Sequence, residues 1–289
     1  MLKENVIILG HSGFIGSKLE TYLTKTEHFN IIGRSLPELD LTDREQINKL
    51  IPFINSECTI ILAAAVKRQF GDTLEVFDQN MSIVENLCRL LDDHPIKRLI
   101  YMSSAAVYGE ETENTNISEL TPVNPTSYYG INKFTSECLF RRTFNSNSTT
   151  KLICLRPPLI YGPGDLGRTY GPSGFISSAL DKTEITLWGD GTELREFIFI
   201  EDLCKIIEKL IKSSFEGILN VTSGVSYRFI DIIEILQKKF PNLQYVTKSR
   251  SKEKVDNAFD ARKLFSIIGN EFKFVNLEDG INKIINDQG

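Results

Sequence analysis

Residues 6–16 read VIILGHSGFIG, an apolar run followed by glycines at a GxxGxxG spacing. The run predicts a short buried strand, and the glycines stand where that strand turns into a helix. Gly10 permits the tight turn, Gly13 lets backbone approach a pyrophosphate, and Gly16 lets the helix pack closely on the strand. A purely structural turn is the alternative, but the position after a strand favours a phosphate loop. The expected cofactor-binding residues of this loop are Gly10, Ser12, Gly13, Phe14, Ile15 and Gly16.

The rest of the first half alternates strand and helix patterns. Further apolar runs lie at Ile31–Ile32, Thr59–Leu62, Arg98–Met102 and Leu152–Leu155. Between them, apolar residues recur at the spacing of one helix face, as at Ile83, Val84, Leu87, Leu90 and Leu91. Strands that are apolar throughout suit a parallel sheet covered on both faces. We therefore expect an α/β fold, a doubly wound parallel sheet of the Rossmann type.

Length and the glycine and proline pattern indicate two lobes. A chain of 289 residues suits two unequal parts. Prolines and glycines crowd the segment Pro157–Gly174, which is typical of a loop leaving the sheet. We expect a cofactor-binding domain over residues 1–165, completed by part of 192–222, and a smaller, interleaved mixed α/β substrate lobe over 166–289.

Composition bounds the class of protein. The chain is 41% hydrophobic and 25% charged with a net charge of −5, which gives no general attraction to nucleic acid or acidic lipid. Its cysteines are scattered, at Cys58, Cys88, Cys138, Cys154 and Cys204. That arrangement argues against a disulfide framework or a metal site. With no long apolar run and no leader pattern, we expect a soluble cytoplasmic enzyme that binds neither nucleic acid nor membrane.

The end of the second predicted strand bears on the choice of cofactor. Residues 31–35 read IIGRS, so no acid stands at the tip. A carboxylate there binds the ribose hydroxyl of NAD, whereas a nearby arginine accommodates the extra phosphate of NADP. Arg34 with Ser35 therefore predicts NADPH as the cofactor, with NAD as the alternative. The competing interpretation of Arg34 is a solvated loop residue.

A strand ending in hydroxyls and a tyrosine–lysine pair suggest acid–base chemistry. Residues 97–109 read KRLIYMSSAAVYG, and residues 128–133 read YYGINK on a predicted helix. Tyr129 and Lys133 are four residues apart and share a helix face. A neighbouring ammonium lowers the pKa of a phenol, which is normally about 10. Ser104 could then hold a substrate oxygen while Tyr129 gives or takes its proton. Alone, the pair also fits an ordinary amphipathic helix.

Together these motifs resemble the short-chain dehydrogenase/reductase superfamily, in its extended branch of nucleotide-sugar epimerases, dehydratases and reductases. Residues 155–164, LRPPLIYGPG, and residues 188–202, WGDGTELREFIFIED, are similar to that branch's later motifs. Residues 260–264 and 277–280 are similar to its closing pattern. The likeness covers almost the whole chain in the expected order, which makes it far more specific than any single motif.

The resemblance implies roles for individual residues. Ser104, Tyr129 and Lys133 match the catalytic set, and Lys133 is also expected at the nicotinamide ribose. The remaining cofactor positions it implies are Asp40 and Leu41 at the adenine edge and Ala63 and Ala64 beneath the cofactor. Asn80 matches a structural asparagine. Ser104, Ala105 and Arg195 are expected at the substrate, with Arg195 on its diphosphate. It further implies a homodimer joined through helices over residues 80–91 and 129–142.

Departures from the family pattern narrow the expected activity. Ala105 and Ala106 stand where 4,6-dehydratases carry an acidic pair, so an elimination of water is not expected. Leu159 replaces an asparagine that often contacts substrate. We expect NADPH-dependent reduction of a 4-keto-6-deoxy sugar linked to a nucleoside diphosphate, as in deoxysugar and polysaccharide biosynthesis. The alternatives are a nucleotide-sugar 4-epimerase that retains NAD and, more remotely, a non-catalytic sensor of NADP(H).

Other polar residues fit ordinary surface roles. The histidines His11, His28 and His94 are expected to be surface or packing residues. Lys67, Arg68, Arg168 and Tyr170 could touch the substrate or lie in solvated loops. The mixed-charge segment Lys248–Lys254 predicts a solvated face.

Overall fold

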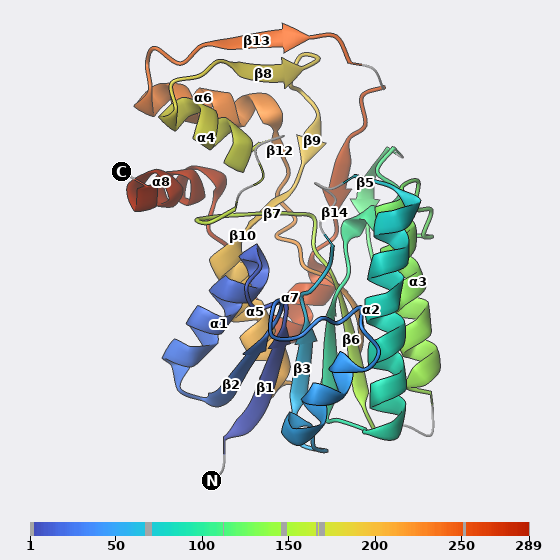
Figure 1. Cartoon of the computed structure of the whole chain (residues 1–289). Coiled ribbons are helices and arrows are strands. Elements are labelled where there is room, and N and C mark those ends of the chain that lie inside the picture. Colours follow the sequence, from blue (N-terminus) through green and yellow to red (C-terminus); the bar gives the residue numbers. More distant parts are fainter. Residues whose placement is uncertain are drawn as a thin grey trace. The chain divides into compact units, whose positions relative to one another are not determined.

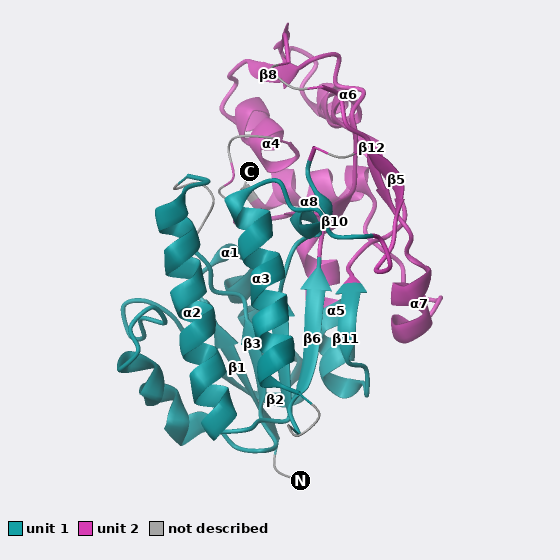
Figure 2. Cartoon of the chain, turned by 90° about the vertical axis from the view of Figure 1, so that its right-hand side faces the viewer, with its two compact units in different colours: residues 1–110, 122–156, 206–219 teal, residues 111–121, 157–205, 220–289 magenta. Residues whose placement is uncertain are grey.

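The computed structural model describes residues 3–66, 71–111, 113–145, 149–165, 167, 171–250 and 253–288. Figure 1 traces the chain through its helices and strands. The chain forms two compact units, shown in teal and magenta in Figure 2. Unit 1 comprises residues 1–110, 122–156 and 206–219, and unit 2 comprises residues 111–121, 157–205 and 220–289. Both units are therefore assembled from separated stretches of sequence.

Unit 1 is built on a six-stranded sheet in the order β11-β6-β4-β3-β1-β2. Its strands are β1 (Glu4–Leu9), β2 (Phe29–Arg34), β3 (Thr59–Leu62), β4 (Arg98–Met102), β6 (Lys151–Arg156) and β11 (Gly217–Asn220). The pairs from β2 through β6 are parallel. Each apolar run expected as a strand in this half is one, and the predicted Rossmann-type fold is confirmed.

Helices cover the sheet. They are α1 (Phe14–Thr26), α2 (Leu74–Asp93), α3 (Tyr128–Thr143) and the second half of α5 (Ile200–Lys212), with short 3₁₀ turns η1 (Gln46–Phe53) and η3 (Ala105–Tyr108). Figure 2 shows α2 and α3 side by side over one face of the sheet. The apolar stripe expected on α2 is buried: Ile83, Val84, Leu87, Leu90 and Leu91.

Both faces of the sheet are buried, which explains why its strands are apolar throughout. Successive side chains of a strand point to opposite faces. Ile7 and Leu9 of β1 join the apolar core beneath α2. Val6 and Ile8 point to the other face and are equally inaccessible to solvent. A polar residue at alternate positions would therefore be buried without a partner on either face.

The chain order creates a switch point beside β1. From β1 the chain moves to β2 on one side and then crosses to β3 on the other. In open α/β sheets, ligands bind outside the carboxyl ends of the strands at such a point. Here that edge carries Gly10, directly after β1, and Ala63, directly after β3. The glycine loop thus lies where the topology predicts a ligand.

Unit 2 consists of short strand pairs and helices around its own apolar core. The strand pairs are β7 (Leu159–Tyr161) with β10 (Phe197–Phe199), β8 (Ile185–Trp188) with β13 (Tyr245–Lys248), β5 (Asn114–Ile117) with β14 (Asn257–Phe259), and β9 (Leu194–Arg195) with β12 (Tyr227–Arg228). Its remaining helices are α4 (Ser173–Leu180), α6 (Phe229–Lys239), α7 (Arg262–Ile268) and α8 (Leu277–Gln288).

One expectation about this unit is wrong. The segment Pro157–Gly174, expected as loop throughout, contains strand β7, which pairs in parallel with β10. Tyr161 at its end is 1% exposed and packs edge-on against the rings of Phe197 and Phe199. The partner strand β10 and both phenylalanine rings lie more than thirty residues later in the chain. Pairing and packing with them stabilise a strand where the local glycines and prolines alone favour a loop.

No helix within the described part of the chain combines the length and apolar character needed to span a membrane.

Candidate functional site

The glycine loop is held by contacts that admit no side chain. Gly10 has φ +89°, and a Cβ there would lie 2.6 Å from the Cα of Ala64. A Cβ on Gly16 would lie 2.1 Å from the carbonyl oxygen of Gly10. The turn is closed by the amide of Gly13, which donates to the Gly10 carbonyl at 3.0 Å. The loop therefore presents bare backbone at the carboxyl edge of the sheet.

Helix α1 begins at this loop, and no side chain caps its first turn. Gly13 is the N-cap and has no side chain with which to cap the helix. Phe14 and Ile15 form the first turn, and Ser12 just before it is exposed. The first amides of a helix have no intrahelical acceptor and carry the positive end of its dipole. Such an end is suited to a phosphate.

Arg34 ends β2 close to this loop. Its carbonyl accepts from the amide of Gly10 at 2.8 Å, so the strand end and the loop are joined. Its guanidinium donates to the carbonyl of Gly33 at 2.6 Å and lies 4.4 Å from the ring centroid of Phe53. The next residue, Ser35, is buried and its hydroxyl donates to the carbonyl of Leu36. Both polar groups are thus held at the end of β2.

Two carboxylates that the sequence pattern did not indicate, Glu20 and Glu38, lie beside His11 of the glycine loop. His11 of the glycine loop contacts Glu20 of α1 at 3.1 Å and Glu38 at 3.9 Å. A Cβ on Gly33 would lie 2.4 Å from a carboxylate oxygen of Glu20. Because Glu20 lies on the helix rather than on the strand tip, the tip sequence alone did not reveal this acid.

Asp40 and Leu41 follow in a loop fixed by its own hydrogen bonds. The Asp40 carboxylate accepts from the amide of Thr42 at 2.9 Å and from its hydroxyl at 2.7 Å. Leu41 is buried, and its carbonyl accepts from the side-chain amide of Asn86 on α2 at 3.0 Å. The loop is therefore anchored to α2, which fixes the predicted adenine-edge residues.

Ser104 lies between β4 and η3. It is the N-cap of η3, and its hydroxyl oxygen accepts from the amide of Ala106 at 3.1 Å. This bond uses a lone pair and leaves the hydroxyl proton available for donation. Ala105 in the first turn of η3 is half-buried. The hydroxyl is thus part of an ordered turn rather than of a loose loop.

The start of α3 packs directly on this turn. A Cβ on Gly130 would lie 2.7 Å from the carbonyl oxygen of Ala106, so only glycine allows the approach. The helix is capped by Ser127, whose hydroxyl accepts from the amide of Gly130 at 3.1 Å. The amide of Tyr129 donates to the carboxylate of Asp72 at 2.9 Å. These contacts bring the turn that carries Ser104 to the helix that carries Tyr129.

Lys133 is the buried member of the predicted set. Its side chain is 6% exposed, and its ammonium donates to the carbonyl of Met102 at 2.7 Å. The ammonium lies 5.6 Å from the ring centroid of Tyr129. Burial lowers the pKa of Lys133 from 10.5 to about 8. The positive charge is therefore held under the tyrosine in a place where its proton is unusually easy to lose.

Asn80 joins α2 to the segment after β3. Its side-chain oxygen accepts from the amide of Val66 at 2.8 Å, and its side-chain nitrogen donates to the carbonyls of Val66 and Val76. Both polar atoms of the Asn80 side chain are therefore hydrogen-bonded to backbone groups of Val66 and Val76. Its contacts are of the structural kind that the sequence analysis expected.

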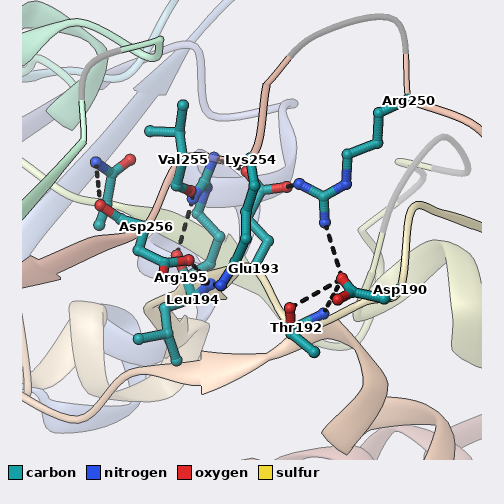
Figure 3. A network of polar contacts seen from close by, with 10 residues as sticks. Asp190, Thr192, Glu193, Leu194, Arg195, Arg250, Lys254, Val255 and Asp256 are labelled. Carbon is teal, nitrogen blue, oxygen red and sulfur yellow. Dashed lines mark hydrogen bonds and ion pairs between the residues drawn. The ribbon is translucent and has the colours of Figure 1, made fainter.

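Arg195 lies in unit 2 within the polar network of Figure 3. Its guanidinium donates to the carboxylate of Glu193 and to the carbonyls of Leu194 and Val255. The side chain is 20% exposed. The planar fork is thus held in one orientation with part of its surface open.

A second arginine shares this network. Arg250 donates to the other carboxylate oxygen of Glu193 at 2.7 Å and lies 3.7 Å from Asp190. Its side chain is 16% exposed, so the solvated face expected for Lys248–Lys254 is wrong at this position. The pairing with Glu193, more than fifty residues earlier, is what buries it. A run of mixed charge carries no sign of such a partner.

Some suggested substrate contacts lie outside the described residues: Lys67, Arg68, Arg168 and Tyr170. Within the described ranges, no three histidine, cysteine or acidic side chains are grouped closely enough to hold a metal ion.

Residues 6–221 match the model of the family described as the NAD dependent epimerase/dehydratase family. The match spans most of the chain and includes the glycine loop, Ser104, Tyr129, Lys133 and Arg195. The chain belongs to this family. The predicted relationship to nucleotide-sugar enzymes of the extended short-chain dehydrogenase/reductase branch is confirmed.

Relatives in this family act on different sugars. GDP-6-deoxy-D-talose 4-dehydrogenase from Aggregatibacter actinomycetemcomitans is 24% identical over 282 residues, which cover 94% of each protein. The structure of UDP-glucose 4-epimerase from Thermotoga maritima with UDP-glucose superposes with a TM-score of 0.86 at 20% identity, covering 98% of this chain and 97% of the other. The structure of RMD from Pseudomonas aeruginosa with NADPH superposes with a TM-score of 0.85 at 21% identity, covering 99% of this chain and 98% of the other. The structural likeness establishes the fold.

Proposed function

We propose that this protein reduces a 4-keto-6-deoxy sugar linked to a nucleoside diphosphate, using NADPH. The observation that carries the proposal is the packing of η3 on α3, which brings the turn bearing Ser104 to the helix of Tyr129 and Lys133. Ala105 and Ala106 offer no carboxylate for the elimination of water. The relative from Aggregatibacter is a 4-dehydrogenase of a GDP-linked 6-deoxy sugar, which also supports chemistry at that carbon.

The residues around the glycine loop fit a dinucleotide. The space that Cβ atoms on Gly10 and Gly16 would fill is occupied by backbone, and the open end of α1 offers amides to a pyrophosphate. Asp40, Leu41, Ala63 and Ala64 would line the remaining part of the cofactor. NADPH supplies a hydride to the carbonyl carbon of the sugar when it is bound.

The chain itself supplies the proton and the orientation. Tyr129 gives its phenolic proton to the oxygen of the carbonyl as that oxygen gains electrons. Ser104 donates a hydrogen bond to the same oxygen. Lys133, charged beside the tyrosine ring, favours the phenolate that is left behind. Arg195 and Arg250, sharing Glu193, provide planar donors for the diphosphate of the substrate.

A 4-epimerase that retains NAD is the second candidate, and one observation favours it. Glu20 lies against Gly33 at the end of β2, where a carboxylate would bind a ribose hydroxyl and repel an additional phosphate. Arg34, at the same strand end, favours the phosphate instead. The two candidates therefore differ first in their cofactor.

The experiment that separates them begins with purified protein. Bound dinucleotide is released by denaturation and identified. NADPH oxidation is then followed with dTDP-, CDP- and GDP-linked 4-keto-6-deoxy sugars, and products are identified by NMR, with Tyr129→Phe as the inactive control. Consumption of NADPH with one of these sugars supports the reductase. Retained NAD, with interconversion of UDP-sugars and no net consumption of NADPH, supports the epimerase and overturns the reductase.

The proposal includes a homodimer joined through α2 and α3. Leu74 on α2 and Tyr128 and Ile131 on α3 are large apolar or aromatic residues that are 53%, 43% and 40% exposed. Light scattering of the purified chain tests this: a monomer mass at micromolar concentration contradicts it.

A further inference from the structure

The buried face of α3 is polar. Lys133, Ser136 and Glu137 are at most 6% exposed on a helix that packs against the sheet. Buried charges in proteins are almost always paired, because an isolated charge loses its hydration. The proposed chemistry uses Lys133 and gives no role to Glu137, one helical turn further along.

Glu137 is held by three hydrogen bonds from two residues. Arg156 at the end of β6 donates from Nε to Oε1 at 2.9 Å and from Nη2 to Oε2 at 2.6 Å. Ser103, the residue after β4, donates its hydroxyl to Oε1 at 2.5 Å. Both oxygens of the carboxylate are thus satisfied in a bidentate pair, which is the geometry in which such a pair is most specific. Glu137 is fully buried and Arg156 is 2% exposed.

These contacts surround Ser104. Ser103 immediately before it is bonded to Glu137, and Met102 is bonded to Lys133. Tyr108, at the other end of η3, has its ring centroid 4.9 Å from the guanidinium of Arg156. Before Ser104, the chain is therefore bonded to Glu137 and Lys133 of α3. After it, the chain contacts Arg156, the partner of Glu137.

We propose that Glu137, oriented by Arg156, is a positioning residue that fixes the Ser104 turn against α3 and supplies the opposite charge beside Lys133. This inference rests on the proposed function of Ser104, Tyr129 and Lys133. Glu137 positions the turn through its hydrogen bond with Ser103, and its negative charge acts on Lys133.

The charge around Lys133 comes from several elements. Tyr101 of β4 has its ring 5.0 Å from the ammonium, and Tyr129 and Glu137 share its helix. Arg156 and Cys154 lie on β6 near Glu137. Glu137 raises the pKa of Lys133 against the larger effect of burial. Without that carboxylate, Lys133 would release its proton at a lower pH and would stabilise the Tyr129 phenolate less.

A spectroscopic titration of Tyr129 tests the charge role without a substrate. The ultraviolet absorbance of tyrosinate is followed against pH, and the matching Tyr129→Phe curve is subtracted to isolate Tyr129. The double variant Glu137→Gln/Arg156→Met removes both members of the Glu137–Arg156 pair, so that neither is left without the other and only Lys133 loses its opposite charge. We expect the double variant to raise the titration midpoint of Tyr129 by about one pH unit. At a pH below the midpoint, the fraction of Tyr129 present as phenolate would then be about tenfold lower. Circular dichroism verifies that the variant is folded.

Two serine variants test the positioning role. Ser103→Ala keeps both charges and removes the bond to the turn, and we expect kcat for the keto sugar to fall about tenfold at an unchanged KM. Ser136→Ala is the matched control, because Ser136 is equally buried but its hydroxyl donates to Asn132 within α3. It should leave kcat unchanged, because it keeps the bond between Ser103 and Glu137.

The outcomes separate this inference from the proposed function. A raised midpoint in the double variant supports the role of Glu137 even if no keto sugar is reduced. A folded double variant that titrates at the wild-type pH overturns it, even if a keto sugar is reduced. Should the double variant not fold, equal kcat values for Ser103→Ala and Ser136→Ala overturn it.

Discussion

The ammonium of Lys133 donates a hydrogen bond to the carbonyl of Met102 at 2.7 Å, joining α3 to the end of β4. The bond holds a charge under Tyr129 and at the same time fixes the strand that leads into Ser104. A single buried side chain thus links the orientation of the turn to the electrostatics of the tyrosine.

Tyr129→Phe should abolish most of the activity and keep the fold. The phenol supplies the proton in the proposed reaction, and general acid catalysis contributes roughly 10²–10⁴-fold. NADPH consumption with the active keto sugar measures the loss, and NADPH fluorescence verifies that the cofactor still binds. Tyr128→Phe, the neighbouring and more exposed tyrosine, is the control and should stay within twofold of wild type as an order-of-magnitude expectation. Equal activity of both variants would contradict the role of Tyr129.

The protonation of Lys133 should appear in the stability of the fold. Its pKa is lowered by burial to about 8, whereas the unfolded chain keeps the usual 10.5. Between these values the unfolded chain binds the proton that the folded chain has lost, so the free energy of unfolding rises with pH.

This rise is measured against Lys133→Met, in which position 133 does not titrate. From pH 8 to pH 10, wild type should gain about 2 kcal/mol over the variant in urea unfolding. A difference that is flat or falls with pH would show that the lysine is not desolvated.

Gly10→Ala should destabilise the protein and prevent cofactor binding. The new Cβ combines a φ of +89° with a contact 2.6 Å from Ala64. Backbone strain and overpacking together amount to about 3 kcal/mol. Gly217→Ala is the matched control, because Gly217 has φ +109° but nothing within 4 Å of its Cβ position.

Gly217→Ala should cost only about 1–2 kcal/mol and leave NADPH binding intact. The difference between the two variants measures the close approach of the loop to Ala64. If both variants lose the same stability and bind NADPH alike, the loop is not constrained as described.

Arg34→Ala should weaken NADPH relative to NADH. A charged hydrogen-bond donor to a phosphate corresponds to roughly 10- to 100-fold in affinity. Glu20→Gln should act in the opposite direction, because it removes a negative charge beside Gly33. Fluorescence titrations with both cofactors give the preference. Arg89→Ala, an exposed arginine on α2, is the control for net charge. An unchanged preference in Arg34→Ala removes Arg34 from cofactor recognition.

Arg195→Ala should weaken binding of the nucleoside diphosphate by roughly 10- to 100-fold, since it removes a planar charged donor. Calorimetry with dTDP, CDP, GDP and UDP measures this and identifies the preferred base. Arg228→Ala is the control, because Arg228 is an exposed arginine of the same unit that pairs with Asp231. Equal affinity in the two variants would exclude Arg195 as the diphosphate contact.

Local patterns in the sequence were enough for the sheet, the glycine loop and the tyrosine–lysine helix. Apolar runs such as Val6–Leu9 and Thr59–Leu62 are strands because both faces of a parallel sheet are covered. Spacing alone places Tyr129 and Lys133 on one face of α3. The short strand β7 was missed, since its pairing with β10 and the burial of Tyr161 depend on a distant segment.

The sequence by itself determined which backbone conformations and helix faces are available, because these depend on neighbours a few residues apart. The tertiary structure decided which charges meet. Glu137 with Arg156 and Arg250 with Glu193 join residues that are 19 and 57 positions apart. Such pairs form only when strands and helices pack, and burial then gives each charge its partner and its effect on the site.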